Sequence, residues 1–220
     1  MANKKTRQIE IQNANKAKRD MAKKKLGTWP VFTALALIVT ALLMFVPFMD
    51  IYNDPNVEGA FNASANGGRP FVEIGAGGWQ CAFIALTHNY TSAESALAPF
   101  YYWVTSEGGQ PYVSMLAIAS LAAAAALVIS LILQTVVYFT KAHTLSLIAV
   151  VADFVMAAAF FIAFAAALSC GETMLAGYCN NNPACSLRSF AIIPALASLG
   201  VLALDVIHFI KFRQAEKLSG

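Results

Sequence analysis

Apolar residues occur in this chain as four long blocks rather than at alternating positions. The blocks cover residues 29–48, 112–139, 145–168 and 190–210. A bilayer core is about 30 Å thick and a helix rises about 1.5 Å per residue, so about 20 apolar residues cross it. Inside lipid each backbone N–H and C=O must be bonded within its own segment, which requires helices. The pattern predicts an all-α transmembrane protein, an antiparallel four-helix bundle.

Composition supports a membrane protein. Apolar residues make up 58% of the 220 residues and charged residues 12%, whereas soluble domains carry about 25% charged residues. We therefore divide the chain into a basic segment, residues 1–28, and a four-span membrane domain, residues 29–220.

Lys and Arg residues gather on one side of the predicted spans. Nine of the 15 lie before Trp29, one lies between the second and third spans, and three follow the fourth span. Because basic residues resist translocation, we expect both termini in the cytoplasm and the loops 49–111 and 169–189 outside the plasma membrane. The basic segment 1–28 is expected to contact anionic lipid in the bilayer and no nucleic acid.

The first outer loop is too long for a simple connector, and we expect it to form a small, partly β cap. The stretch "FMDIYND" (48–54) predicts a strand directly after the first span. A second strand is predicted at "FVEI" (71–74), ended by the glycines of "GAGG" (75–78). The following "WQCAFIAL" (79–86) is expected to be extended or helical.

Aromatic residues cluster where this cap meets the predicted membrane surface. A capping box at Thr91 and Glu94 predicts a short helix that leads into the cluster. Trp and Tyr favour the headgroup level, where the ring is buried and its polar atom stays hydrated. We expect an interface belt made of Trp79, Tyr101, Tyr102 and Trp103.

The four cysteines, Cys81, Cys170, Cys179 and Cys185, all fall on the outer side of the predicted topology, where disulfides persist. One is in the first outer loop and three are in the second. Any complete pairing therefore needs one bridge between the loops and one within the second loop. The sequence favours Cys81–Cys170 with Cys179–Cys185, and the alternative is Cys81–Cys185 with Cys170–Cys179.

Three ionisable residues interrupt the apolar blocks: Asp153 in the third, and Asp205 and His208 in the fourth. Such residues are costly in lipid and often functional. They lie near the cytoplasmic ends of their spans, and Asp205 and His208 share a helix face. No matching polar residues continue to the outer leaflet, so we favour a hydrogen-bonded clasp between the third and fourth spans over a proton or ion relay.

Four spans, a large first outer loop and a small second one resemble the claudin-like group of tetraspan membrane proteins. That group has a Gly-Leu-Trp-x-x-Cys-type motif in a β-rich first loop, and "GGWQC" (77–81) is similar to it. The group places both cysteines of its bridge in the first loop, whereas this chain has only Cys81 there. The resemblance implies an adhesive, barrier-forming or accessory role.

The sequence shows no pattern for a catalytic site, a cofactor or a metal. We expect a non-enzymatic integral membrane protein that contacts a protein partner, or a second copy of itself, through its outer loops. One alternative is a small transporter or channel that uses the intramembrane Asp and His residues. A second is a membrane thiol-disulfide oxidoreductase, although the chain has no Cys-x-x-Cys pair.

Overall fold

The computed structural model describes residues 13–14, 16–17, 26–54, 56, 74–90, 97, 110–140, 144–177, 179 and 182–217. Among these residues, three helices are long and apolar enough to cross a membrane: α5 (Gln110–Thr140), α6 (Thr144–Gly177) and α7 (Ile192–Lys217). The sequence predicted these three spans; α5 and α6 extend beyond their predicted bounds at both ends, and α7 begins two residues later and ends seven residues later than predicted.

The predicted first span is wrong in its extent. Helix α2 (Trp29–Leu43) has 15 residues, and the chain then turns at Met44–Val46 and enters strand β1 at Pro47. Proline cannot donate the backbone hydrogen bond that a longer helix would need there, but it is tolerated as the first residue of a strand. The structure therefore does not confirm four full-length spans.

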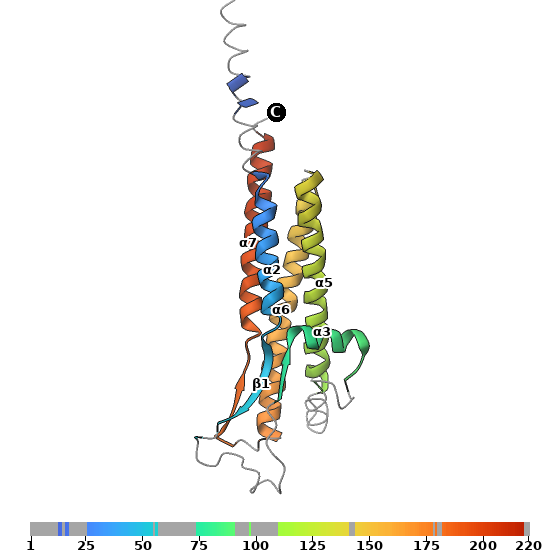
Figure 1. Ribbon diagram of the computed structural model, residues 1–220, viewed down its shortest axis with the longest axis vertical. Helices are drawn as coiled ribbons and strands as arrows, with labels where there is room; N and C mark the ends of the chain where they lie inside the picture. The colour runs from blue at the N-terminus through green and yellow to red at the C-terminus, as the bar shows by residue number, and fades with distance from the viewer. Residues whose placement is uncertain are drawn as a thin grey trace, which may run out of the picture.

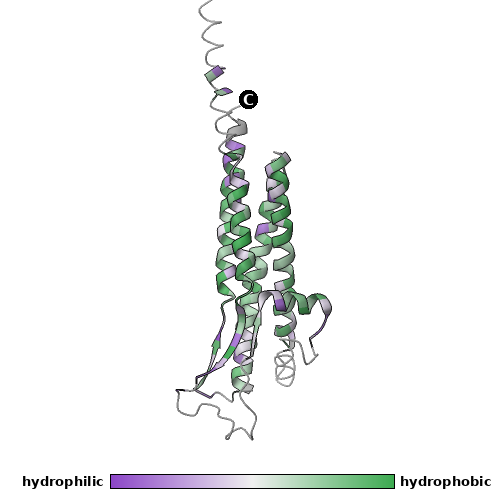
Figure 2. Ribbon diagram, in the orientation of Figure 1, coloured by the Kyte–Doolittle hydropathy of each residue, from purple (hydrophilic) through white to green (hydrophobic). Residues whose placement is uncertain are grey.

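The helices α2, α5, α6 and α7 pack in a ring, in which each contacts two of the others. Helix α2 packs against α5 and α7, and α6 packs against the same two helices. Figure 1 shows α2 beside α7, with α2 beginning and α7 ending at the end opposite the sheet. Apolar residues run along α2, α5, α6 and α7 (Figure 2). Many large apolar side chains on these helices are exposed, as helices in contact with lipid require.

A small antiparallel sheet lies at the other end of the helices. Among the described residues its order is β2 (Ile74–Gly77), β1 (Pro47–Asn53) and β3 (Cys185–Arg188). The strand predicted directly after the first apolar block is confirmed as β1. The cap is not built from the first outer loop alone, because β3 comes from the second.

The glycine-rich stretch was predicted to end a strand, and that prediction is wrong. Gly75, Ala76 and Gly77 belong to β2 and pair with β1. Pairing with a neighbouring strand outweighs the low strand propensity of glycine. Residues 71–73 of the predicted strand lie outside the described residues.

The second outer loop is shorter than predicted because α6 continues past residue 168 to Gly177. Its last turns pack against β1 and β3. One continuous core therefore joins helices and sheet, and Phe48 of β1 meets Phe160 of α6 edge to face at 6.3 Å. The helix predicted after Thr91, the aromatics Tyr101, Tyr102 and Trp103, and most of segment 1–28 lie outside the described residues.

Candidate functional site

A buried polar cluster lies between the helices, nearer to the end opposite the sheet. Its centre is Asp153 of α6 and Asp205 of α7, whose exposed fractions are 0% and 1%. The side chains of these two residues lie next to each other and interact. The structure thus brings together the two carboxyl groups that the sequence singled out.

Helix α5 supplies a neutral hydrogen-bond donor to each carboxyl group. Ser130 Oγ donates to Asp153 Oδ1 at 2.5 Å. Gln134 Nε2 donates to Asp205 Oδ2. Neither donor was predicted from the sequence, although the two residues lie four positions apart and so share one face of a mostly apolar helix.

Helix α2 is the fourth helix that contributes side chains to the cluster. Thr33 is fully buried, and its hydroxyl donates to the backbone carbonyl of Trp29 at 3.5 Å, next to the Asp205 side chain. One turn earlier, Trp29 Nε1 donates to the backbone carbonyl of Leu204 at 3.0 Å. The cluster therefore links α2, α5, α6 and α7, whereas the sequence predicted a clasp between α6 and α7 alone.

His208 and Lys211 follow the cluster along α7. His208 is buried, and its ring stacks on Trp29 with centroids 6.4 Å apart. Lys211 Nζ lies 4.9 Å from the centroid of the same indole. His208 also interacts electrostatically with Asp205. The basic side chains near the carboxyl pair thus lie toward the last turns of α7.

A second constellation lies where the sheet meets the helices. All four cysteines are buried, and the structure records them as free thiols. Cys81 interacts with Cys170, and Cys179 interacts with Cys185. These are the neighbours that the favoured pairing requires, and the disulfides themselves stay a prediction. Burial, with a smaller effect from Cys170, raises the pKa of the Cys81 thiol to about 12.

The "GGWQC" stretch forms the joint between α2, the sheet and α3 (Gly78–Thr87). Trp79 Nε1 donates to the carbonyl of Ala41 at 2.9 Å, and its backbone N–H donates to the carbonyl of Met44 at 3.2 Å. The first bond gives the Ala41 carbonyl a second donor beside the Met44 N–H, and the second satisfies a carbonyl just past the end of α2. Trp79 was predicted in an interface belt, and the structure shows its indole N–H bonded to protein backbone.

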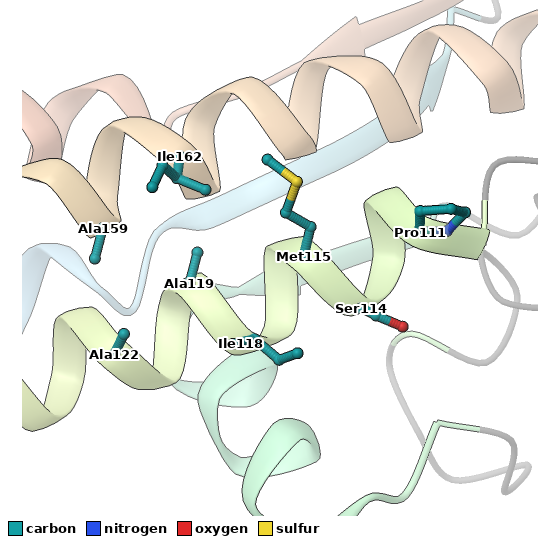
Figure 3. A pocket seen from close by; sticks show the side chains of 8 residues that line it. All are labelled: Pro111, Ser114, Met115, Ile118, Ala119, Ala122, Ala159 and Ile162. Atoms are coloured by element: carbon teal, nitrogen blue, oxygen red, sulfur yellow. The ribbon is translucent and has the colours of Figure 1, made fainter.

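An apolar groove runs between α5 and α6 at the sheet end of these helices (Figure 3). Its volume is about 420 Å³. It is lined by Pro111, Ser114, Met115, Ile118, Ala119, Ala122, Ala159 and Ile162. These residues include no titratable side chain and no nucleophile beyond a single serine hydroxyl, so the groove offers no chemistry of its own.

The described residues contain no group of three His, Cys, Asp or Glu side chains that could hold a metal ion. Known families give no further guide, since no family model and no curated protein matches the chain. Function must therefore be inferred from the cap, the cysteines and the polar cluster.

Proposed function

We propose that the chain is a non-enzymatic integral membrane protein that uses its cap to bind another protein or a second copy of itself. Both termini are cytoplasmic, the cap is outside the plasma membrane, and the role is adhesive or that of an accessory subunit. The observation that carries this proposal is the outward face of the three-stranded sheet.

That face presents polar and aromatic side chains on a fixed backbone. In the β1–β3 register Asp50 is opposite Arg188, and Tyr52 is opposite Ser186. The guanidinium carbon of Arg188 lies 3.9 Å from the Tyr52 ring centroid. Arg188 and Ser186 are exposed, while Ile51 between the two β1 side chains is buried. Tyr and Arg are among the residues that most often dominate binding energy at protein interfaces.

The sheet is well anchored, which suits a contact surface. Ser189 Oγ donates to the carbonyl of Phe48 at 2.7 Å, and the Asp54 N–H donates to the carbonyl of Ala184 at 2.9 Å. A surface that is rigid before binding loses less conformational entropy when a partner docks.

A membrane crossing by α2 is part of the proposal, although its regular helix is short. The N–H groups of Met44, Phe45 and Val46 donate to the carbonyls three residues earlier, which continues the helix as a tighter turn. From Trp29 to Val46 the segment is then about 27 Å long at about 1.5 Å per residue. That length approaches the bilayer core, and the backbone stays satisfied, as lipid demands.

Site-specific photocrosslinking tests the cap as a binding surface. A benzoylphenylalanine in place of Ser186 should form a protein adduct in native membranes, and one in place of Phe139, at the far end of α5, should not. Arg188→Glu should weaken adduct formation by about tenfold or more, the effect of a hot-spot residue. The matched control is Arg213→Glu, which removes a guanidinium 5.5 Å from the Phe209 ring at the other end of the protein. Absence of any Ser186 adduct would contradict the proposal.

The resemblance to the claudin-like group enters as part of the proposal. Its support is a strand that follows α2 directly and a Gly-Trp-x-Cys stretch at the joint with the cap. The presence of one cysteine in the first outer loop remains the difference from that group. The contact role rests on the sheet face and does not depend on this resemblance.

We also propose that the cysteines form two structural disulfides, Cys81–Cys170 and Cys179–Cys185. The first would close a loop of about 90 residues, worth roughly 4 to 5 kcal/mol in the loop-entropy model. Burial also argues against thiol redox chemistry, because a thiol with a pKa of about 12 holds almost no reactive thiolate near neutral pH. Peptide mapping without reductant should recover these two bridges, and Cys81–Cys185 would contradict the assignment.

A further inference from the structure

The two carboxyl groups of the polar cluster are surrounded mostly by neutral side chains. Helices α2 and α5 contribute only neutral groups to it: Trp29, Thr33, Ser130 and Gln134. The titratable or charged groups that face it are Asp153 itself from α6, and Asp205, His208 and Lys211 from α7. The Lys211 ammonium is directed at the Trp29 indole rather than between the carboxyl groups.

Each carboxyl group also has one buried oxygen that receives no hydrogen bond from another residue's donor: Asp153 Oδ2 and Asp205 Oδ1. Two adjacent carboxylates in a low-dielectric interior repel each other strongly, and such pairs ionise one at a time. A single proton between the groups removes one charge and gives both oxygens a partner.

The donors around the pair are unequal. Asp205 accepts from Gln134 and lies near Thr33 and the basic His208, whereas Asp153 accepts from Ser130. Hydrogen bonds to the charged form favour that form. The anion is therefore better placed on Asp205, and the acid proton on Asp153.

We propose that Asp153 and Asp205 form a binding site for one exchangeable proton, which Asp153 carries and donates to Asp205, and which leaves through His208. On release the Asp153 O–H bond breaks, its electron pair stays on the Asp153 carboxylate, and the proton passes to Asp205; the nearby His208 imidazole then takes it from Asp205 before water removes it. The result is two adjacent anions between α6 and α7, so proton occupancy controls the contact of these helices. This property goes beyond the proposed contact role of the cap.

Infrared spectroscopy of the full chain in lipid nanodiscs tests the site. A protonated carboxylic acid has a C=O stretch that a carboxylate lacks. At neutral pH the wild type should show this band, and it should shift in D₂O and vanish as the pH is raised. Asp153→Asn should remove the band, because the amide can donate to Asp205 without a proton. The control Glu172→Gln, an exposed residue of the same helix, should leave it unchanged.

Three outcomes would overturn the site. They are absence of the acid band in the folded wild type, its persistence in Asp153→Asn, and a band that neither shifts in D₂O nor responds to pH. Loss of the band on addition of Na⁺ but not K⁺ at constant pH would assign the site to sodium instead. Should Asp153→Asn fail to fold, ¹³C-labelled aspartate in the wild type shows whether the band belongs to an aspartic acid, and among the described aspartates only Asp153 and Asp205 are buried.

The role of His208 in proton exchange is tested by the rate at which the acid band shifts in D₂O. His208→Gln should retain the acid band but slow its shift in D₂O by about tenfold or more, since a positioned acid or base accelerates proton transfer at least that much. An unchanged rate of shift in this variant would remove His208 from the route.

Discussion

Gly78→Ala should destabilise the protein because the added methyl group has no space. A Cβ at this position would lie 2.4 to 2.9 Å from three atoms of the Phe48 ring. The ring cannot easily retreat, since Phe48 is fully buried against the equally buried Phe160. Its backbone is also fixed by the hydrogen bond from Ser189. Overpacking of this kind costs about 1–3 kcal/mol.

The free energy of unfolding in mild detergent measures this effect. Phe48→Leu shortens the opposing side chain, so the double variant should be more stable than the sum of the two single changes by about 1 kcal/mol or more. The matched control is Gly200→Ala, where a Cβ meets nothing within 4 Å and the helix should gain up to about 1 kcal/mol. A Gly78→Ala variant as stable as the wild type, or strict additivity with Phe48→Leu, would refute the packing argument.

Three further perturbations test the joint between cap and helices. Trp79→Phe keeps a ring but removes one of the two donors to the Ala41 carbonyl, which still accepts from the Met44 N–H, so the free energy of unfolding should fall by about 0.5–1.5 kcal/mol; an unchanged value would show that water replaces the bond. Gly171→Ala places a Cβ 2.3 Å from Leu187 Cδ1 and should lower stability despite the better helix propensity of alanine, whereas Gly171→Ala with Leu187→Ala should be relieved of that strain. In reduced protein, Cys81, with a pKa of about 12, should resist iodoacetamide at pH 8 until the protein unfolds, and rapid labelling of the folded state would contradict its burial.

The fold was predictable where it depends on local sequence and hidden where it depends on distant pairing. Uninterrupted apolar length identified α5, α6 and α7, and the stretch after residue 47 identified β1. Strand β3 has four residues and pairs with a strand more than 130 positions away, so no local pattern could reveal it. The extension of α6 was missed because the apolar run ends near residue 168, while packing against the sheet keeps the later turns helical.

The ionisable residues of the candidate site were predictable because placing them in lipid costs free energy. Asp153, Asp205 and His208 stood out because charge in lipid is expensive. Ser130 did not, because a helix in lipid tolerates small hydroxyl side chains at little cost. Which helices meet at the carboxyl pair is a property of the three-dimensional packing, and one sequence without that packing does not contain it.

The contact between α2 and α7 has a consequence for biosynthesis. The Trp29 indole N–H donates to the carbonyl of Leu204, 175 positions later in the chain. One edge of β1 stays unpaired until β3 has been synthesised. At about 5–20 residues per second, translation leaves α2 without its α7 partner for roughly ten seconds or more. Chains truncated before α7 would lack the acceptors of Gln134 and of the Trp29 indole, and quality control in the membrane would recognise them by that exposed polarity.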